Sequence, residues 1–293
     1  MQKILAKLEL PDRFSPIQKG AVYMLISVLG FALLNLTVKF LPHLPATELV
    51  LFRSAVSLIL SLLMIRQKNI SPFGNNKKWL ILRGVFGVIA LTLFFYTLQK
   101  MPIASAITIQ YLSPIFTVVL ASLLLGEHMR KIQWLFFLIA FIGVGIIKGF
   151  DNSVSTYLLI LGIISAMFTG LAYNAIRKLK DSEDPVVIVF YFPLVATPVM
   201  LIISLFYWVM PQGIDWVLLI LMGILTQIAQ IHMTKALQVA PISKMAPLNY
   251  IGIIFAILFD MVIFDVQFQW ITLVGIGLVI LGVVLNMLQK NAT

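Results

Sequence analysis

The chain has 293 residues, of which 61% are hydrophobic and 11% are charged, and its formal net charge is +10. A water-soluble globule of this composition would expose most of its apolar surface, so the sequence predicts an all-α polytopic membrane protein. The absence of cysteine excludes disulfides and thiolate metal sites, and the basic residues lie at the ends of apolar segments, which argues against nucleic acid as a partner.

Residues 1–17 form a charged segment before the first apolar run. The stretch MQKILAKLEL predicts a short amphipathic helix at the membrane interface, through Ile4, Leu5 and Leu8. No short apolar region followed by a small-x-small cleavage site is present, so we expect this cytoplasmic segment to be retained.

Apolar runs of about 20 residues, the length that a helix needs to cross a bilayer, follow one another along the rest of the chain. They predict ten transmembrane helices, at 18–40, 45–66, 78–99, 103–125, 131–149, 155–178, 184–208, 215–237, 242–263 and 268–289. The loops between them are short, and no soluble domain is expected. The lipid bilayer is therefore a predicted partner.

The second half of the sequence repeats the first at a fixed offset of 139 residues. The offset relates Asn35 to Asn174 and Gly84 to Gly223. It also places Leu98, Pro102, Tyr111 and Phe116 on Leu237, Pro241, Tyr250 and Phe255. We therefore predict two copies of one five-helix unit, at 18–149 and 155–289.

Most basic residues of the loops fall on one side of the predicted membrane, and the other side keeps Lys39, Lys100 and Lys148. The positive-inside rule then predicts that both termini are cytoplasmic. Because each unit has an odd number of spans, the second enters the membrane from the opposite side. The two repeats are thus expected to be inverted, an arrangement from which many alternating-access carriers are built.

Four short motifs resemble those of a known family. They are ATELVLFR at 46–53, the pair Arg83-Gly84, PIASAITIQYLSPIF at 102–116 and LGE at 125–127. With the five-plus-five duplication, they resemble the EamA branch of the drug/metabolite transporter superfamily over residues 18–289. The resemblance implies a compact ten-helix bundle with a central solute cavity. The second half departs from the pattern, because Phe264-Asp265-Val266 stands in place of LGE and the run 187–192 in place of ELVLFR.

Polar residues at helical spacing mark candidate faces of that cavity. Gln110 and Ser113 share a face of the fourth predicted helix, and Asn249 lies on the corresponding face of the ninth. Such faces turn toward protein or water rather than lipid. Close helix packing is the alternative explanation, because small residues favour it as well.

Further amides lie inside other predicted helices. Asn35 is in the first, Asn174 in the sixth, and Gln227 and Gln230 in the eighth. In hydrocarbon each needs a hydrogen bond, from a neighbouring helix or from a solute. His232 is either a proton-linked group or a core histidine.

Arg53 is the most informative single residue. It lies seven residues past the start of the second predicted helix, about 10 Å along the axis. Glu48 is five positions away and thus poorly placed to pair with it. Arg53 therefore needs a partner on another helix, a water-filled vestibule or an anionic solute. Arg83 and the helix-end residues Lys39 and Lys178 are expected to reach the membrane surface by snorkelling.

The first, third, fourth, sixth, eighth and ninth helices are expected to line the cavity, with tyrosines as stacking surface. The candidate substrate-binding residues are Asn35, Arg53, Tyr96, Gln110, Tyr111, Ser113, Asn174, Gln227, Gln230, His232, Asn249 and Tyr250. No HExxH, GxSxG or phosphate-loop motif occurs, so we predict no catalytic residue, metal or cofactor.

We predict a secondary transporter of a small organic metabolite, such as an amino acid or a carboxylate-bearing solute. We expect it in the inner membrane of a bacterium, with proton coupling left open. A non-transporting membrane scaffold is the alternative.

Overall fold

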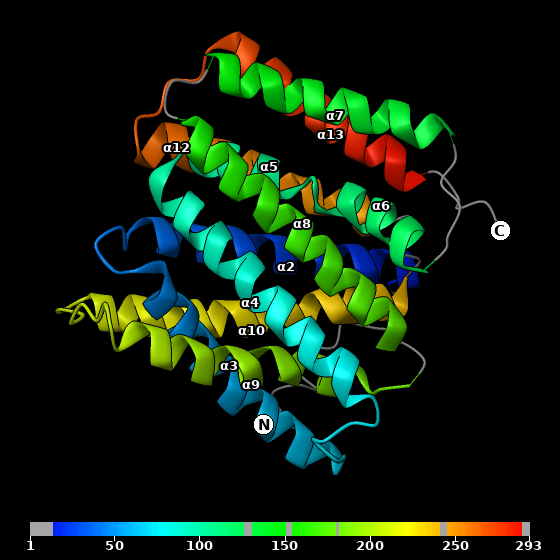
Figure 1. The fold of residues 1–293 in the computed structure, drawn as a ribbon, viewed down its shortest axis with the longest axis vertical. Coiled ribbons are helices and arrows are strands. Elements are labelled where there is room, and N and C mark those ends of the chain that lie inside the picture. The colour runs from blue at the N-terminus through cyan, green and yellow to red at the C-terminus, as the bar shows by residue number, and fades with distance from the viewer. Residues whose placement is uncertain (1–13, 126–130, 151–153, 180–181, 241–244, 289–293) are drawn as a thin grey trace.

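The computed structural model describes residues 14–125, 131–150, 154–179, 182–240 and 245–288, and these form a bundle of helices (Figure 1). Within these ranges no strand occurs, so the predicted all-α class is confirmed. The predicted interfacial helix at the N-terminus lies outside the described residues, and so does Glu127 of the LGE motif.

The helices of the first half are α2 (Pro16–Lys39), α3 (Ala46–Lys68), α4 (Lys77–Lys100), α5 (Ile103–Gln110), α6 (Ser113–Leu125) and α7 (Lys131–Phe150). Those of the second half are α8 (Thr156–Leu179), α9 (Pro185–Ser204), α10 (Asp215–Val239), the 3-10 helix η1 (Ala246–Tyr250), α12 (Ile251–Ile263) and α13 (Trp270–Leu288). Among the described residues, 8 segments are long and apolar enough to cross a membrane, with Ile103–Leu123 counted as one. Two shorter apolar helices, Leu248–Ile263 and Trp270–Asn286, occupy the last two predicted spans.

Local sequence signals fix several helix ends. Ser15 and Gln18 form a capping box, in which the Gln18 N–H donates to Ser15 Oγ at 3.3 Å and the Ser15 N–H to Gln18 Oε1 at 2.9 Å. Pro16 follows at the first helical position, where a missing N–H costs nothing. Asn69 ends α3 in the left-handed conformation, with φ of 54°.

The fourth predicted span is interrupted. Tyr111 and Leu112 separate α5 from α6, just before Pro114, which has no N–H to donate. The boundary between η1 and α12 falls at Tyr250, which is the position 139 residues after Tyr111. Both halves therefore interrupt regular helix geometry at the same point of the repeat.

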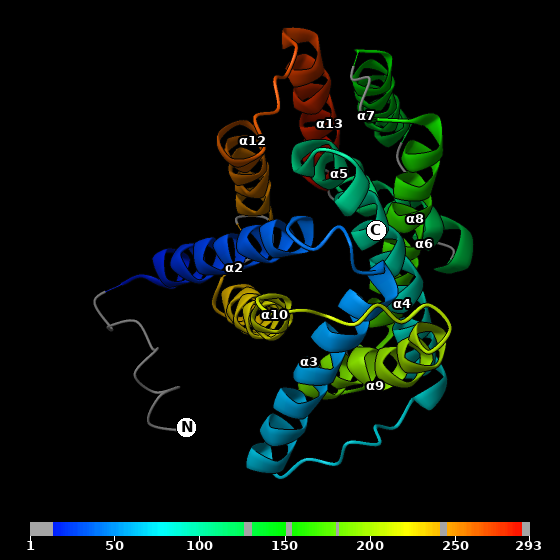
Figure 2. The same ribbon diagram turned by 90° about the vertical axis from the view of Figure 1, so that its left-hand side faces the viewer.

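Helices from different halves lie side by side. α2 lies beside α10, α4 beside α8, α3 beside α9, and α7 beside α13 (Figures 1 and 2). The pair α7 and α13 occupies one extremity of the long axis of the molecule.

Two glycines show how the halves meet. A Cβ at Gly84 of α4 would lie 2.6 Å from Val195 Cγ2 of α9, and a Cβ at Gly223 of α10 would lie 2.5 Å from Val56 Cβ of α3. Each contact is the counterpart of the other under the offset of 139 residues. These positions therefore need glycine for close approach of the helices.

We call the left edge of Figure 1, where α4 ends and α5 begins, the Met101 end, and the opposite edge, where α4 begins, the Asn76 end. The described chain starts and finishes at the Asn76 end. Arg66, Lys68, Lys77, Lys78, Lys131, Arg177 and Lys178 are exposed there, whereas Lys39, Lys100 and Lys148 lie at the Met101 end.

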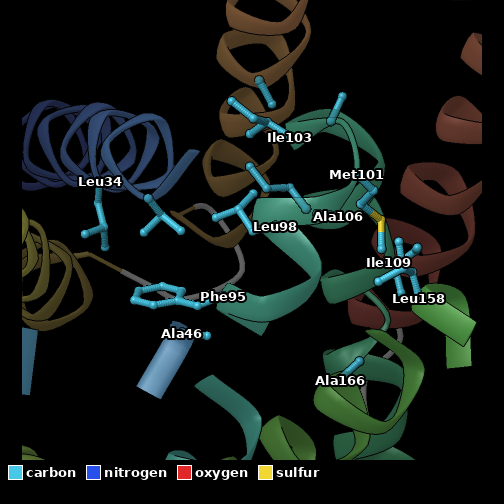
Figure 3. Packing of buried hydrophobic residues seen from close by; sticks show 14 of the residues in the cluster. Leu34, Ala46, Phe95, Leu98, Met101, Ile103, Ala106, Ile109, Leu158 and Ala166 are labelled. Carbon is cyan, nitrogen blue, oxygen red and sulfur yellow. The ribbon is translucent and has the colours of Figure 1, made fainter. Parts of the chain in front are cut away.

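The Met101 end is filled by hydrophobic side chains. Phe95, Leu98 and Ile103 are fully buried, and Met101 is 1% exposed. Figure 3 shows Phe95, Leu98 and Ile103 in the space between α2, α4 and α12. This end of the bundle is closed in the structure.

Candidate functional site

Arg53 lies inside the bundle and is 5% exposed. Its Nε donates to Thr226 Oγ1 of α10 at 2.9 Å, and Thr226 donates in turn to the Met222 carbonyl at 2.9 Å. The Arg53 Cζ is 5.4 Å from the ring centroid of Phe192 and 6.0 Å from that of Phe95. Arg53 is therefore held by one hydroxyl and two aromatic faces.

Arg83 lies against the same phenylalanine. Its Cζ is 5.1 Å from the Phe192 centroid. Gly87, one turn along α4, leaves room for this contact, because a Cβ there would lie 2.8 Å from Phe192 Cδ2 and 2.9 Å from Arg83 Nη1. The Arg83 Nε is buried and has no hydrogen-bond partner. Arg83 as a whole is partly exposed, so the expectation that it reaches the membrane surface stays a prediction.

Neither arginine has an acidic partner among the residues that the structure describes. The acidic residues in those ranges are Glu48, Glu183, Asp184, Asp215, Asp260 and Asp265. Glu48 Oε1 accepts the Val209 N–H at 2.6 Å, and Asp260 accepts two backbone N–H groups of α5. Asp215 pairs with His43 at 2.9 Å, and Asp184 lies 3.9 Å from Lys68. We call Arg53 and Arg83, with Phe192 between their helices, the arginine pair.

Three tyrosines interact with one another, and one of them, Tyr173, also interacts with the arginine pair. The rings of Tyr111 and Tyr250 meet edge to face with centroids 4.9 Å apart, and the Tyr111 hydroxyl donates to the Asn249 carbonyl at 2.6 Å. Tyr173 of α8 interacts electrostatically with Arg83, Tyr111 and Tyr250. Tyr173 is nevertheless 47% exposed.

The Gln110 amide is bound by α8. Its Nε2 donates to Thr169 Oγ1 at 2.7 Å, and its Oε1 accepts from Ser165 Oγ at 2.9 Å. Ser165, Thr169 and Tyr173 follow one another at four-residue spacing, so they share a face of α8. Gln110 thus ties α5 to α8 one turn away from the exposed Tyr173.

Lys39 and Asp260 form a separate polar cluster at the Met101 end. Lys39 Nζ donates to the carbonyls of Leu98, Gln99 and Met101, at 3.3, 3.4 and 2.6 Å, at the end of α4. Asp260 accepts the N–H groups of Ile103 and Ala104, at 2.9 and 2.7 Å, at the start of α5. Lys39 therefore binds the negative end of one helix dipole and Asp260 the positive end of the next.

Most of the chain matches one protein family. The EamA-like transporter family matches residues 18–148 and again residues 156–288. The chain belongs to the EamA-like transporter family. This EamA-like chain is therefore an integral membrane protein of a transporter family rather than an enzyme.

Two relatives of this EamA-like transporter are named for different solutes, and a third is named as a solute carrier. The pseudopaline exporter CntI of Pseudomonas aeruginosa is 31% identical over 242 residues, which are 82% of this chain and 85% of the exporter. The riboflavin transporter of Vibrio cholerae is 29% identical over 80% of this chain and 81% of its own. Solute carrier family 35 member G1 of Mus musculus is 30% identical over 87% of this chain and 74% of its own.

A solved crystal structure matches the fold with a TM-score of 0.60 and 17% identity, over 90% of this chain and 94% of that one. At this level of identity the likeness concerns the fold alone. It shows that the arrangement of helices in this EamA-like transporter recurs in another protein.

The structure brings only some of the predicted site residues of this EamA-like transporter together. Gln110, Tyr111, Asn249 and Tyr250 meet at the interrupted helices, and Arg53 lies in the arginine pair. Ser113, 6% exposed, begins α6 directly after the interruption.

Other predicted residues contact neighbouring helices. Asn174 Nδ2 donates to the Thr117 carbonyl of α6 at 3.0 Å, and Gln227 Nε2 lies 3.3 Å from Met64 Sδ of α3. His232 Nδ1 is 2.8 Å from the Ile228 carbonyl of its own helix, and its ring lies 5.9 Å from that of Tyr23. Gln230, also on α10, is partly buried.

Two predicted residues lie apart from these groups. Tyr96 stacks edge to face with Tyr157, with centroids 6.4 Å apart, under the ammonium of Lys100 near the Met101 end. Asn35 is 9% exposed, and no described residue hydrogen-bonds its amide. Asn35 shares a face of α2 with Val28, seven residues before it. A Cβ at Gly252 would lie 3.0 Å from the Tyr111 hydroxyl and 3.7 Å from Val28 Cγ1.

Sequence reasoning missed Phe192, Arg83 and Tyr173 as site residues. Phe192 could have been found from the repeat, because it is the residue 139 positions after Arg53. Arg83 was assigned to the membrane edge from its position in the helix alone. For Tyr173 the four-residue spacing from Thr169 was the available signal.

Proposed function

We propose that this protein is a secondary transporter that carries a small carboxylate-bearing metabolite across the inner membrane of a bacterium by alternating access. In this proposal residues 18–149 and 155–289 are the two inverted five-helix units, and both termini are cytoplasmic. Arg53, Tyr111, Asn249 and Tyr250 contact the solute. The other predicted substrate-binding residues stay predictions.

The observation that carries the proposal is the position of Arg53. It is 5% exposed, and the described residues supply it with a hydroxyl acceptor but no carboxylate. A cation inside a membrane protein is costly unless it is paired, and such residues mark solute or ion pathways. A carboxylate on the transported solute would supply the missing charge.

The contacts between the halves support inverted units. Gly84 against Val195 and Gly223 against Val56 form one exchanged pair of contacts. A second exchanged pair joins Gly143 to Val279 and Gly282 to Ala140. A Cβ at Gly143 would lie 2.8 Å from Val279 N, and a Cβ at Gly282 would lie 2.8 Å from Ala140 N. Such exchange is expected when two copies of one unit are related by a pseudo-two-fold axis, the geometry of many carriers.

The interrupted helices support a solute site at this depth. Carriers with inverted repeats bind their solutes where transmembrane helices are broken, because free backbone groups there can meet a ligand. Tyr111 and Leu112 interrupt one helix, and η1 precedes α12 in the other.

Uptake by the purified protein in proteoliposomes tests the proposal. Vesicles are given a mixture of neutral, cationic and carboxylate-bearing metabolites, and the trapped solutes are identified by mass spectrometry. We expect uptake of a carboxylate-bearing solute, and loss of that uptake in Arg53→Gln, because the glutamine carries no charge.

Arg66→Gln is the matched control, because Arg66 is exposed at the end of the same helix and should not contact the solute. An Arg53→Gln protein that folds and takes up the solute with unchanged affinity would contradict the role of Arg53. The absence of uptake of any solute by the folded wild-type protein would contradict the transporter itself.

A further inference from the structure

The arginine pair places two positive charges against a single ring. The guanidinium carbons of Arg53 and Arg83 lie 5.4 and 5.1 Å from the Phe192 centroid. Neither forms an ion pair with any described acidic residue, and the Arg83 Nε is buried without a partner. Arg53 is buried and Arg83 is partly buried, so two like charges lie close together without a counter-charge among the described residues.

The aromatic contacts do not account for this arrangement. A cation above an aromatic face gains about 0.5–2 kcal/mol. Removing a charge from water costs several kcal/mol, and the mutual repulsion of the two guanidiniums adds to that cost. The protein alone therefore leaves the arginine pair short of stabilisation.

The repeat indicates that the scaffold does not require these charges. The residues 139 positions after Arg53 and Arg83 are Phe192 and Met222, and the residue 139 positions after Gly87 is Thr226. The same structural positions are thus filled by apolar side chains in the second half. Charge at both positions of the first half points to a ligand.

We propose that Arg53 and Arg83 together bind a small organic solute that carries two carboxylates, one for each guanidinium. The proposal rests on the transporter function above and names its substrate class. The planar fork of arginine matches a carboxylate with two parallel hydrogen bonds. Tyr173, which interacts electrostatically with Arg83, offers its hydroxyl as a further hydrogen-bond donor to the solute.

Three related compounds test the number of charges that the site reads. Succinate, succinamate and succinamide share one carbon skeleton and carry two, one and no negative charges at neutral pH. Each is added to the purified wild-type protein, and thermal unfolding is followed, because a ligand of the folded state raises the unfolding temperature. We expect the strongest protection from succinate, about tenfold weaker binding of succinamate, and none of succinamide.

Arg83→Met copies the residue of the second repeat at this position and removes one charge. The Arg83→Met protein should bind succinate no more tightly than it binds succinamate. The Arg66→Gln protein should behave as wild type. Arg83→Lys keeps the charge without the fork and should bind succinate at an intermediate level. Equal protection by succinate and succinamide, or by succinate and inorganic phosphate, would overturn the proposal.

The stability of the ligand-free protein provides an independent measurement. If Arg83 is kept for binding, Arg83→Met removes an unpaired buried charge and should raise the unfolding temperature without ligand. A lower unfolding temperature, together with undiminished protection by succinate, would show a structural role and overturn the proposal. Uptake of neutral solutes alone would leave the transporter intact and refute the arginine site.

Discussion

At the scale of single residues, Asp260 has the clearest structural role. Its carboxylate is fully buried and caps α5 by accepting the N–H groups of Ile103 and Ala104. Hydrogen bonds to a charged group contribute about 1.5–3 kcal/mol each. Asp260→Ala should therefore lower the free energy of unfolding by several kcal/mol, measured as thermal or denaturant unfolding in detergent.

Asp265→Asn is the control for this measurement. Asp265 is exposed and has a φ of 51°, a conformation that asparagine also adopts readily. Its substitution should leave stability unchanged. If Asp260→Ala lowers the free energy of unfolding as little as Asp265→Asn does, the cap of α5 contributes little to stability.

The two arginines show which residues sequence could place. Arg53 lies deep in its helix, so its need for a partner was evident before the structure. Arg83 lies six residues into α4, where a long side chain can reach either the membrane surface or the interior. Its direction depends on Gly87, one turn along the same helix, and on Phe192, which packs beside it from the other half of the chain. Such a contact cannot be derived from helix periodicity.

At the scale of helices, the contact between α7 and α13 depends on glycine. A Cβ at Gly143 would lie 2.6 Å from the Gly275 carbonyl oxygen, and one at Gly275 would lie 2.9 Å from the Gly143 oxygen. Backbone atoms cannot yield without separating the helices. Gly143→Ala should therefore destabilise the protein in thermal unfolding.

Gly145→Ala provides a matched control two residues away, where a Cβ would have no atom within 4 Å. It should be neutral or stabilising, because alanine favours a helix over glycine by about 1 kcal/mol. Equal stability of the two alanine variants would contradict close packing of α7 on α13.

Hydrophobic runs predicted the existence of the helices but not their interruptions. Residues 103–125 form one continuous apolar run, and only Pro114 signalled a break within it. The observed break at Tyr111 and Leu112 also depends on the Tyr111 hydroxyl, which binds the Asn249 carbonyl of the other half. That partner is known only once the two halves are in contact.

At the scale of the whole molecule, the basic residues predict its orientation. Exposed lysines and arginines gather at the Asn76 end, so we expect that end to be cytoplasmic. The chain has no cysteine, so single cysteines can be introduced without background. Lys100→Cys should react with a membrane-impermeant reagent in intact cells, and Lys77→Cys only after permeabilisation.

Both lysines are exposed at the ends of one helix, α4, and thus differ mainly in the side of the membrane. The opposite labelling pattern would reverse the orientation. Labelling of both cysteines in intact cells would contradict a membrane-spanning α4.

The duplication was visible in the sequence at this scale, and the pairing of helices across the halves was not. Identical residues at one offset show that two units exist. They do not show that α2 lies beside α10 or α4 beside α8, because that choice depends on which apolar faces fit together. For the same reason the contacts of Asn174 with Thr117 and of His232 with Tyr23 could not be derived from the sequence, and the place of both residues in the solute site stays a prediction.

The cluster of Lys39 and Asp260 is present at only one end of the molecule. The residues at the corresponding positions of the opposite repeats are Lys178, which is exposed, and Ala121, which can accept no side-chain hydrogen bond. A state that is closed at the Asn76 end and open at the Met101 end would lose the five charged hydrogen bonds of Lys39 and Asp260. The counterpart residues at the Asn76 end would form different and weaker contacts. In the alternating-access cycle that we propose, most molecules without solute would then rest with the Met101 end shut. A solute arriving from that side would then show a lower apparent affinity, reduced by the fraction of open molecules, although its binding residues are the same.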